Sequence, residues 1–206
     1  GIRAMVTFRA KSPNRLKSKV QRRNSQRSVP YKNMREIYED IADLVGVRVS
    51  LYFPGDRNKM NSLISENFEL LETKQFPEQS KPPTYNRRFS GYWANHYRVH
   101  LREDSLDGSQ KKYATTRIEI QVASVLMHAW SEVEHDLTYK PLQGTLSNEE
   151  LAILDELNGL VLAGEIALER LQDAGNARIR SKNAILNNQY ELATYLYNYL
   201  SNNFKP

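Results

Sequence analysis

The pattern of hydrophobic and polar positions divides the chain into a first part that mixes strands and helices and a second part that is helical. Alternation of apolar and polar side chains, with β-branched residues, is typical of strands that have one buried face. Strands are expected at residues 1–10, 45–53, 68–76, 93–102 and 113–122. Helices are expected at residues 12–23, 33–42, 57–67 and 124–137. Residues 77–90 contain three prolines and little periodicity, so we expect a mobile surface loop there.

Two longer helices are expected after residue 146. The residues Ser147 to Glu150 form a capping box, which opens a helix predicted to run to about Asp173. A last helix is expected over residues 179–202. The apolar stripes expected to point inward consist of Leu151, Leu154, Leu157, Val161, Leu168 and Leu171 in the first helix and Leu186, Tyr190, Ala193, Leu196, Tyr197 and Leu200 in the second. This order of elements predicts an α/β (α+β) fold, in which one mixed sheet carries helices and a helical extension follows.

Composition limits the classes of protein to which the chain can belong. Its 206 residues, 40% of them hydrophobic, fit one domain with a helical extension or at most two small domains. The absence of cysteine excludes disulfides, cysteine-ligated zinc and iron–sulfur clusters. No segment is apolar enough to span a membrane and no secretory signal is present, so we expect a cytoplasmic protein without a membrane partner. The chain begins at Gly1 rather than at methionine, which indicates a shortened form of a longer chain.

Charge is distributed unevenly along the chain. The net charge is +5, yet residues 1–35 contain eleven Lys or Arg and no acidic residue. A basic segment on an otherwise mildly acidic chain indicates a polyanionic partner. RNA, a membrane surface and a nucleoside triphosphate all fit this charge, which does not distinguish them.

Two carboxylates are candidate metal ligands. Alternation in the predicted strand 113–122 puts Glu119 on one face with Arg117 and Gln121, opposite the apolar residues. Asp43 lies between a predicted helix and the strand that carries Arg48. Mg²⁺ prefers one or two carboxylates together with phosphate oxygens, so Asp43 and Glu119 form a plausible pair. The alternatives are that Glu119 lies on a solvated sheet face and that Asp43 is a turn residue.

A third candidate feature is the segment from Gly91 to His96. Strand alternation puts Tyr92, Ala94 and His96 on one face. An aromatic ring next to an imidazole can stack on a nucleobase. Ordinary packing of Tyr92 against His96 explains the same pattern.

Taken together, these segments resemble the synthetase domain of the RelA/SpoT family, which makes the alarmones (p)ppGpp. The resemblance covers about residues 6–171 and includes the small alarmone synthetases. It is carried by Arg9-Ala10-Lys11-Ser12, Asp43-Leu44-Val45-Gly46-Val47-Arg48, Gly91-Tyr92 with His96, Glu119-Ile120-Gln121, His128-Ala129-Trp130, Glu134-His135-Asp136-Leu137 and Tyr139-Lys140. It implies a nucleotidyltransferase-like core over residues 1–140. Residues 141–206 would be helices that pack on the core or form the interface of a dimer or tetramer.

The resemblance also implies an activity and a role for each matching residue. Family members transfer the β,γ-pyrophosphate of ATP to the 3′-hydroxyl of GDP or GTP and release AMP. For ATP, the implied residues are Arg9 and Arg48 around the adenine and Lys11, Lys19 and Arg22 on the phosphates. For catalysis and Mg²⁺ they are Asp43 and Glu119, with Glu119 as the base. For the acceptor they are Arg88, Tyr92, His96, Gln121, His128 and Glu134.

The chain departs from the family pattern on the acceptor side. Family members usually continue with Arg-Thr where Ala123-Ser124 stand here, and Ala94-Asn95 also differ from the usual residues. Adenosine nucleotides (ATP or ADP) and the 3′ end of tRNA are therefore alternative acceptors, as in toxin-type relatives. A non-catalytic RNA-binding module is the alternative from another class. A zinc hydrolase using His96, His128 and His135 is disfavoured because their spacing does not suit one ion.

Overall fold

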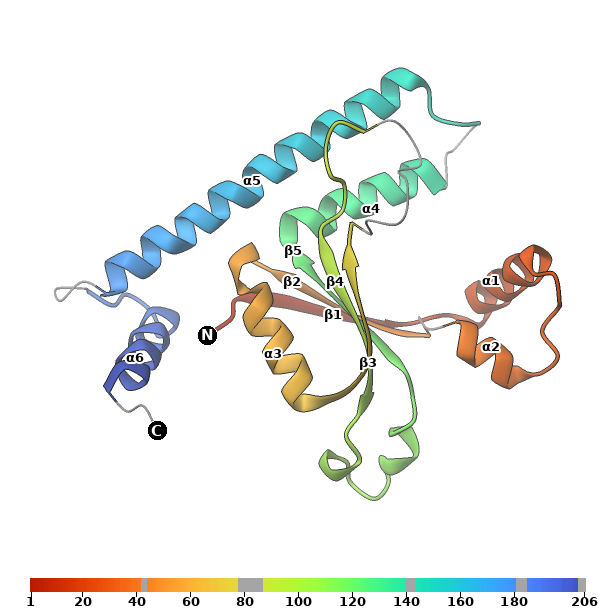
Figure 1. Ribbon diagram of the computed structural model, residues 1–206, viewed down its shortest axis with the longest axis horizontal. Coiled ribbons are helices and arrows are strands. Elements are labelled where there is room, and N and C mark those ends of the chain that lie inside the picture. Colours follow the sequence, from red (N-terminus) through yellow and green to blue (C-terminus); the bar gives the residue numbers. More distant parts are fainter. Residues whose placement is uncertain (42–43, 78–86, 140–143, 181–184, 204–206) are drawn as a thin grey trace.

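The computed structural model describes residues 1–41, 44–77, 87–139, 144–180 and 185–203. Its centre is a mixed five-stranded sheet in the order β1-β2-β5-β4-β3 (Figure 1). The strands are β1 (Ala4–Ala10), β2 (Val45–Leu51), β3 (Phe68–Phe76), β4 (Ala94–Leu101) and β5 (Ile118–Ser124). The strands β2 and β5 are parallel, and all other neighbours are antiparallel. The predicted α+β fold with one mixed sheet is confirmed.

Helices lie on both sides of this sheet and beyond its ends. They are α1 (Pro13–Gln26), α2 (Met34–Asp40), α3 (Arg57–Asn67), α4 (Val125–Tyr139), α5 (Asn148–Arg180) and α6 (Gln189–Asn203). Short 3₁₀ turns are η1 (Pro54–Asp56), η2 (Glu103–Ser105) and η3 (Lys111–Tyr113). In Figure 1, α1 and α2 lie beyond one end of the sheet and α6 lies near the N-terminus. None of the described helices combines the length and apolar character needed to cross a bilayer.

The main hydrophobic core lies between the sheet and α3. Its buried residues are Val49, Leu51, Ile64, Tyr97, Val99, Ile120 and Val122. On β5, Ile120 and Val122 face this core whereas Glu119 and Gln121 point to the other side, as alternation predicts. The polar residues of β5 are therefore presented on the face away from α3.

A smaller core lies under α4 and α5. It contains Ala94, Ala123, Met127 and Trp130, packed against Tyr92, Val161 and Leu162. These helices cover one end of the sheet face that carries Glu119. The other end of this face remains open.

The predicted helix starts after residues 12 and 147 are confirmed by their capping contacts. The hydroxyl of Ser12 accepts a bond from the backbone N–H of Arg15. At α5, the Ser147 hydroxyl accepts from the N–H of Glu150 (3.2 Å), and the Glu150 carboxylate accepts from the N–H of Ser147 (2.7 Å). Such reciprocal bonds satisfy backbone donors that a helix start leaves unpaired.

Three predicted boundaries differ most from the structure. The strand expected over residues 113–122 begins only at Ile118, because main-chain bonds close the turn η3 before it. Helix α5 continues past Asp173 to Arg180, with Ile179 buried, and α6 begins at Gln189. Ile179 is buried near the end of this extension, beyond Leu171, the last residue of the predicted apolar stripe.

The prediction of which apolar residues of the two last helices point inward was also only partly correct. On α5, Leu154 is buried, but Leu157 and Leu171 are 43% and 61% exposed. Buried positions of this helix are instead taken by the polar residues Asp155, Asn158 and Glu165. On α6 the expected inward residues Tyr190, Ala193, Leu196, Tyr197 and Leu200 are exposed. The division at residue 140 and the assembly of copies through these helices stay predictions.

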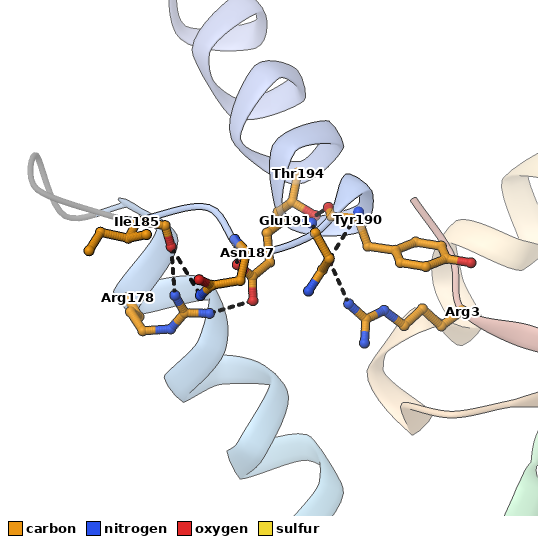
Figure 2. A network of polar contacts seen from close by, with 8 residues as sticks. Arg3, Arg178, Ile185, Asn187, Tyr190, Glu191 and Thr194 are labelled. Carbon is orange, nitrogen blue, oxygen red and sulfur yellow. Dashed lines mark hydrogen bonds and ion pairs between the residues drawn. The ribbon is translucent and has the colours of Figure 1, made fainter.

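Contacts at the start of α6 join both ends of the chain (Figure 2). Arg3 lies over the ring of Tyr190 (4.5 Å) and donates to the side chain of Asn188 (3.2 Å). The same Asn188 oxygen accepts the backbone N–H groups of Tyr190 and Glu191 and so caps α6. Arg178, near the end of α5, pairs with Glu191 (2.6 Å). The segment before β1 is therefore fastened to the junction of α5 and α6.

Candidate active site

On the face of the sheet opposite α3, the side chains form rows that cross the strands. This is because paired residues on neighbouring strands point to the same face. The first row consists of Arg9, Gly46, Glu119, Arg98 and Glu72. The second row consists of Thr7, Arg48, Gln121, His96 and Lys74. Both rows are polar or charged except at Gly46, so this part of the sheet offers a surface suited to a charged ligand.

A third row closes one end of this surface. Ser50 is paired with Ala123, and Ala94 follows on β4. These small residues are almost fully buried, with exposures of 8%, 0% and 1%. The site is therefore bounded by packed helices α4 and α5 on one side.

A cleft of about 560 Å³ opens over the part of the first two rows that β1, β2 and β5 supply. Its lining residues are Thr7, Phe8, Arg9, Ala10, Lys11, Ser12, Arg15, Gly46, Val47, Arg48, Glu119 and Gln121. A Cβ added to Gly46 would meet no atom within 4 Å. The missing side chain of Gly46 therefore leaves the floor open between Arg9 and Glu119.

The carboxylate of Glu119 is fixed by its neighbours on the sheet. The Gln121 amide donates to Oε2 at 3.2 Å, and Nδ1 of His96 lies 3.7 Å from Oε1. The Glu119 side chain is 13% exposed. Its carboxylate is thus held in one orientation at the cleft while remaining reachable from it.

The two arginines predicted to hold adenine both line this cleft. Arg9 comes from the edge strand β1, and Arg48 comes from β2. The guanidinium of Arg48 forms an ion pair with Glu132 of α4. A planar guanidinium stacks well on an aromatic base, and the ion pair restricts the positions that Arg48 can take.

The N-terminus of α1 contributes cations to the same cleft. Lys11 and Arg15 line it together with the N-cap Ser12, and the backbone N–H of Lys11 binds the carbonyl of Leu44 (2.8 Å). Helix N-termini favour anions because their backbone N–H groups and dipole point outward. Arg15 was not among the site residues predicted from the sequence. Its signal was its position four residues before Lys19 on the same helical face.

Lys19 and Arg22 lie further along α1 and do not line the cleft. Lys19 is partly buried and Arg22 is exposed. The structure therefore brings Lys11, but not these two residues, to the cleft wall, and their predicted contacts with phosphate stay predictions.

An aromatic cluster adjoins Glu119 on the side of α4. The Tyr92 hydroxyl lies 3.4 Å from Nε2 of His96, and the rings of Phe76 and His96 are 4.6 Å apart. Burial raises the pKa of the Tyr92 hydroxyl, which therefore stays protonated at neutral pH. Much of this ring packs against protein, so its predicted stacking on an acceptor base stays a prediction.

His128 lies beneath this cluster rather than at the cleft surface. It is 5% exposed, and its ring centroid is 6.3 Å from that of Tyr92. Burial, followed by the nearby charge of Arg48, lowers the pKa of His128 to about 4. The neutral ring binds the carbonyl of Val49 through Nε2 (3.2 Å), and that nitrogen carries the proton because a carbonyl only accepts.

Two further predicted acceptor residues are engaged by other side chains. Arg88 contacts Asp155 and Glu156 of α5, both at 3.4 Å. Glu134 forms an ion pair with Arg87. Both residues lie outside the cleft lining, so their predicted contacts with an acceptor stay predictions.

A comparison with models of protein families shows to which family the chain belongs. The model described as a region found in RelA / SpoT proteins matches residues 8–143. The chain belongs to the RelA/SpoT family. Its matched region is a synthetase domain of the (p)ppGpp type, which makes the chain a pyrophosphokinase-like enzyme. No curated protein matches the sequence.

Solved structures share the RelA/SpoT synthetase fold. Small alarmone synthetase 1 from Bacillus subtilis bound to its product pppGpp is 21% identical, with a TM-score of 0.61 over 84% of this chain and 79% of that chain. The same protein bound to AMPCPP is 19% identical, with a TM-score of 0.57 over 84% and 78%. A GTP pyrophosphokinase family protein from Streptococcus pneumoniae is 20% identical, with a TM-score of 0.64 over 100% and 81%.

Packing explains the departure from the RelA/SpoT pattern at Ala123. Its side chain is fully buried against Ala94 and Trp130, where an arginine would not fit without moving α4. Arg87 lies 6.0 Å from the centre of the Trp130 ring. A cation is thus present on the outer side of this small core, although it comes from a different segment.

Family members use a divalent metal, and one of the two predicted ligands can be placed. Glu119 presents a carboxylate to the cleft, which fits the preference of Mg²⁺ for carboxylate and phosphate oxygens. The other predicted ligand, Asp43, lies outside the described residues. Within the described part of the chain, no three acidic or histidine residues form a ready-made metal site. Glu119 would therefore need Asp43, phosphate oxygens or water to complete a metal site.

Proposed function

We propose that the protein transfers the β,γ-pyrophosphate of ATP to the ribose 3′-hydroxyl of GDP or GTP and releases AMP. The observation that carries this proposal is the carboxylate of Glu119, fixed at the floor of a cleft whose other charged lining residues are all cations. A polyanionic donor suits the cations, and a hydroxyl nucleophile requires a base at the reacting centre.

The donor half of the proposal rests on the cationic wall of the cleft. Arg9 and Arg48 would hold the adenine ring, while Lys11 and Arg15 would bind phosphate oxygens near the start of α1. The Bacillus subtilis relative bound to AMPCPP supports an adenosine triphosphate as donor. Bound Mg²⁺ would neutralise charge on the phosphates, with Asp43 and Glu119 as its protein ligands.

In the acceptor half of the proposal, the attacking 3′-hydroxyl would lie on the side of the site formed by Tyr92 and His96. Glu119 would take the proton from the 3′-hydroxyl as its oxygen bonds to the β-phosphorus. The bond from the β-phosphorus to the oxygen bridging the α- and β-phosphates breaks, and that oxygen leaves with AMP. The relative bound to its product pppGpp supports a guanosine acceptor. Because Ala123 stands where family members usually have an arginine, adenosine nucleotides and the 3′ end of tRNA are competing acceptors.

The test is a transfer assay with Mg²⁺ and ATP labelled at the β- or γ-phosphate. GDP, GTP, ADP, AMP and bulk tRNA are offered separately to the wild type and to Glu119→Gln. Label on GDP or GTP with matching release of AMP, reduced at least ~100-fold in Glu119→Gln, is expected. Glu66→Gln, an exposed position on α3 across the sheet, is the matched control.

The other outcomes distinguish the alternatives. Label on ADP, AMP or tRNA alone would replace the guanosine acceptor by that substrate. ATP binding without transfer to any acceptor would indicate a non-catalytic descendant, such as an RNA-binding module.

A further inference from the structure

Helix α5 holds the backbone of residues 88–91 through two buried polar side chains one turn apart. The first is Asp155, whose side chain is 3% exposed. Its carboxylate accepts the backbone N–H of Arg88 (2.9 Å) and the backbone N–H of Phe89 (3.2 Å). One carboxylate therefore fixes two consecutive peptide units, and its charge strengthens both bonds.

The second side chain is Asn158, which is 1% exposed. Its Oδ1 accepts the N–H of Gly91 at 3.0 Å, and its Nδ2 donates to the carbonyl of Gly91 at 3.3 Å. Gly91 has φ of 79°, a left-handed conformation that glycine adopts at little cost. Asn158 thus satisfies both main-chain groups of a residue where the chain turns sharply.

Close packing supports the same contact. The ring of Phe89 lies where a Cβ on Gly159 would be, so the glycine in α5 allows the ring to approach the helix backbone. Glycine weakens a helix interior, and buried polar side chains are unfavourable unless they are hydrogen-bonded. Asp155, Asn158 and Gly159 carry these costs at one point of α5, where their contacts with residues 88–91 offset them.

The segment held in this way leads directly into the site. Tyr92 follows Gly91, its hydroxyl lies 3.4 Å from Nε2 of His96, and His96 in turn lies 3.7 Å from Glu119. A shift of the backbone at Gly91 would move Tyr92 and would therefore change the shape of the proposed acceptor side of the site, which faces Glu119. By contrast, neither Asp155 nor Asn158 lines the cleft that contains Arg9 and Arg48.

We propose that Asp155 and Asn158 are positioning residues for the acceptor, which they set in place by fixing residues 88–91. The acceptor half of the site is then incomplete without α5, although all of α5 lies outside the segment 8–143 that matches the family. This inference rests on the proposed function, because it concerns the acceptor of that reaction.

The experiment compares the full chain with Asp155→Asn, Asp155→Ala and Asn158→Ala. Asp173→Asn, an exposed carboxylate on the same helix, is the matched control. Steady-state kinetics is measured with ATP and with whichever of GDP, GTP, ADP, AMP or tRNA the wild type uses. Hydrogen exchange of the backbone amides of residues 88, 89 and 91 gives a readout that does not depend on activity.

The expected result is a selective loss on the acceptor side. The acceptor KM should rise about 10- to 100-fold, because small misplacements of positioning groups are costly, while the ATP KM stays within about twofold. Asp155→Asn retains one accepting oxygen and should be milder than Asp155→Ala. The amides of residues 88, 89 and 91 should exchange faster in the variants but not in Asp173→Asn.

Several outcomes would overturn the positioning role. Equal changes in both KM values, or a lower melting temperature with unchanged KM values, would leave only a structural role. Faster amide exchange with an unchanged acceptor KM would show that the contact does not set the acceptor. A wild type that transfers to no acceptor would instead overturn the proposed function itself, and the positioning role with it.

Discussion

Nδ1 of His96 lies 3.7 Å from Oε1 of Glu119, so strand β4 supplies the side chain that faces the carboxylate of β5. The other ring nitrogen of His96 lies 3.4 Å from the hydroxyl of Tyr92. His96 therefore connects the proposed base with the aromatic ring proposed for the acceptor. Both His96 and Glu119 are mostly shielded from water, with side-chain exposures of 14% and 13%.

Replacing His96 should impair the chemical step more than ATP binding. His96→Leu removes both polar contacts, so Glu119 loses one neighbour that orients it. We expect kcat to fall by about 10-fold or more and the ATP KM to change little. His96→Gln keeps a polar group at this position and should lose less. Steady-state kinetics tests this, and full activity in His96→Leu would remove His96 from the site.

Filling the cleft floor should block ATP without unfolding the protein. Gly46 has open space where a side chain would extend, and a β-branched residue suits a strand. Gly46→Val should therefore weaken binding of a non-hydrolysable ATP analogue at least ~10-fold while the melting temperature stays close to wild type. Gly108→Val adds the same side chain at a turn away from the cleft and is the control. Unchanged affinity in Gly46→Val would place the donor elsewhere.

Acid should destabilise the fold through His128. Its pKa is lowered to about 4, against a value of about 6.5 in the unfolded chain. The unfolded state therefore takes up a proton first as the pH falls below about 6.5. Stability should be independent of this group above that pH and should decrease by about 2 kcal/mol by about pH 5. Denaturant unfolding at several pH values measures this loss.

The matched variants separate His128 from other titrating groups. His128→Gln keeps a donor for the carbonyl of Val49 and cannot be protonated, so the acid-dependent loss should become smaller. His135→Gln changes an exposed histidine of the same helix and should leave the loss intact. Equal pH profiles for wild type and His128→Gln would contradict this assignment.

Glu165 should have the opposite pH dependence. Burial raises the pKa of this carboxyl group, which accepts a hydrogen bond from the Ser124 hydroxyl. Its favourable contribution is present below its unfolded pKa and is lost as the pH rises through the higher folded pKa. Glu165→Gln keeps an accepting oxygen without the charge, so it should stabilise the protein near pH 8 and have little effect at low pH. Thermal unfolding at low and high pH tests this, with Asp173→Asn as the control.

The alternation of apolar and polar residues predicted strand positions well where the residues that end the strand could also be recognised in the sequence. The strand β3 spans Phe68–Phe76 as predicted, and α3 ends at Asn67 as predicted. The start of β5 was misplaced because main-chain bonds around residues 110–116 form turns that the alternation of side chains does not indicate. The α5–α6 boundary was misplaced because α5 continues to Arg180, beyond the apolar stripe that ends at Leu171.

The donor side of the site was easier to predict than the acceptor side. Arg9, Lys11, Arg48 and Glu119 line one cleft, because strand register fixes their directions. Arg88, Glu134 and His128 are engaged elsewhere through contacts that connect distant segments. Asp155 and Asn158 were missed because their partners are backbone groups of a segment more than sixty residues earlier.

The experiments above test the roles of these residues. The sequence resemblance assigned them by position in a motif, whereas the structure gives their distances and partners. Asp43 lies outside the described residues, so its pairing with Glu119 as a metal ligand stays a prediction.

The contacts of Arg3 have a practical consequence for handling the protein. Strand β1, which carries Arg9, lies at an edge of the sheet and is paired only with β2, and Arg3 just before it binds Asn188 and Tyr190. An affinity tag joined to Gly1 would crowd this junction at the start of α6. The segment between β4 and β5, which contains Gly108, lies apart from α6 (Figure 1), and Gly108 does not line the cleft. Fluorophores for nucleotide titrations are therefore best attached in that segment.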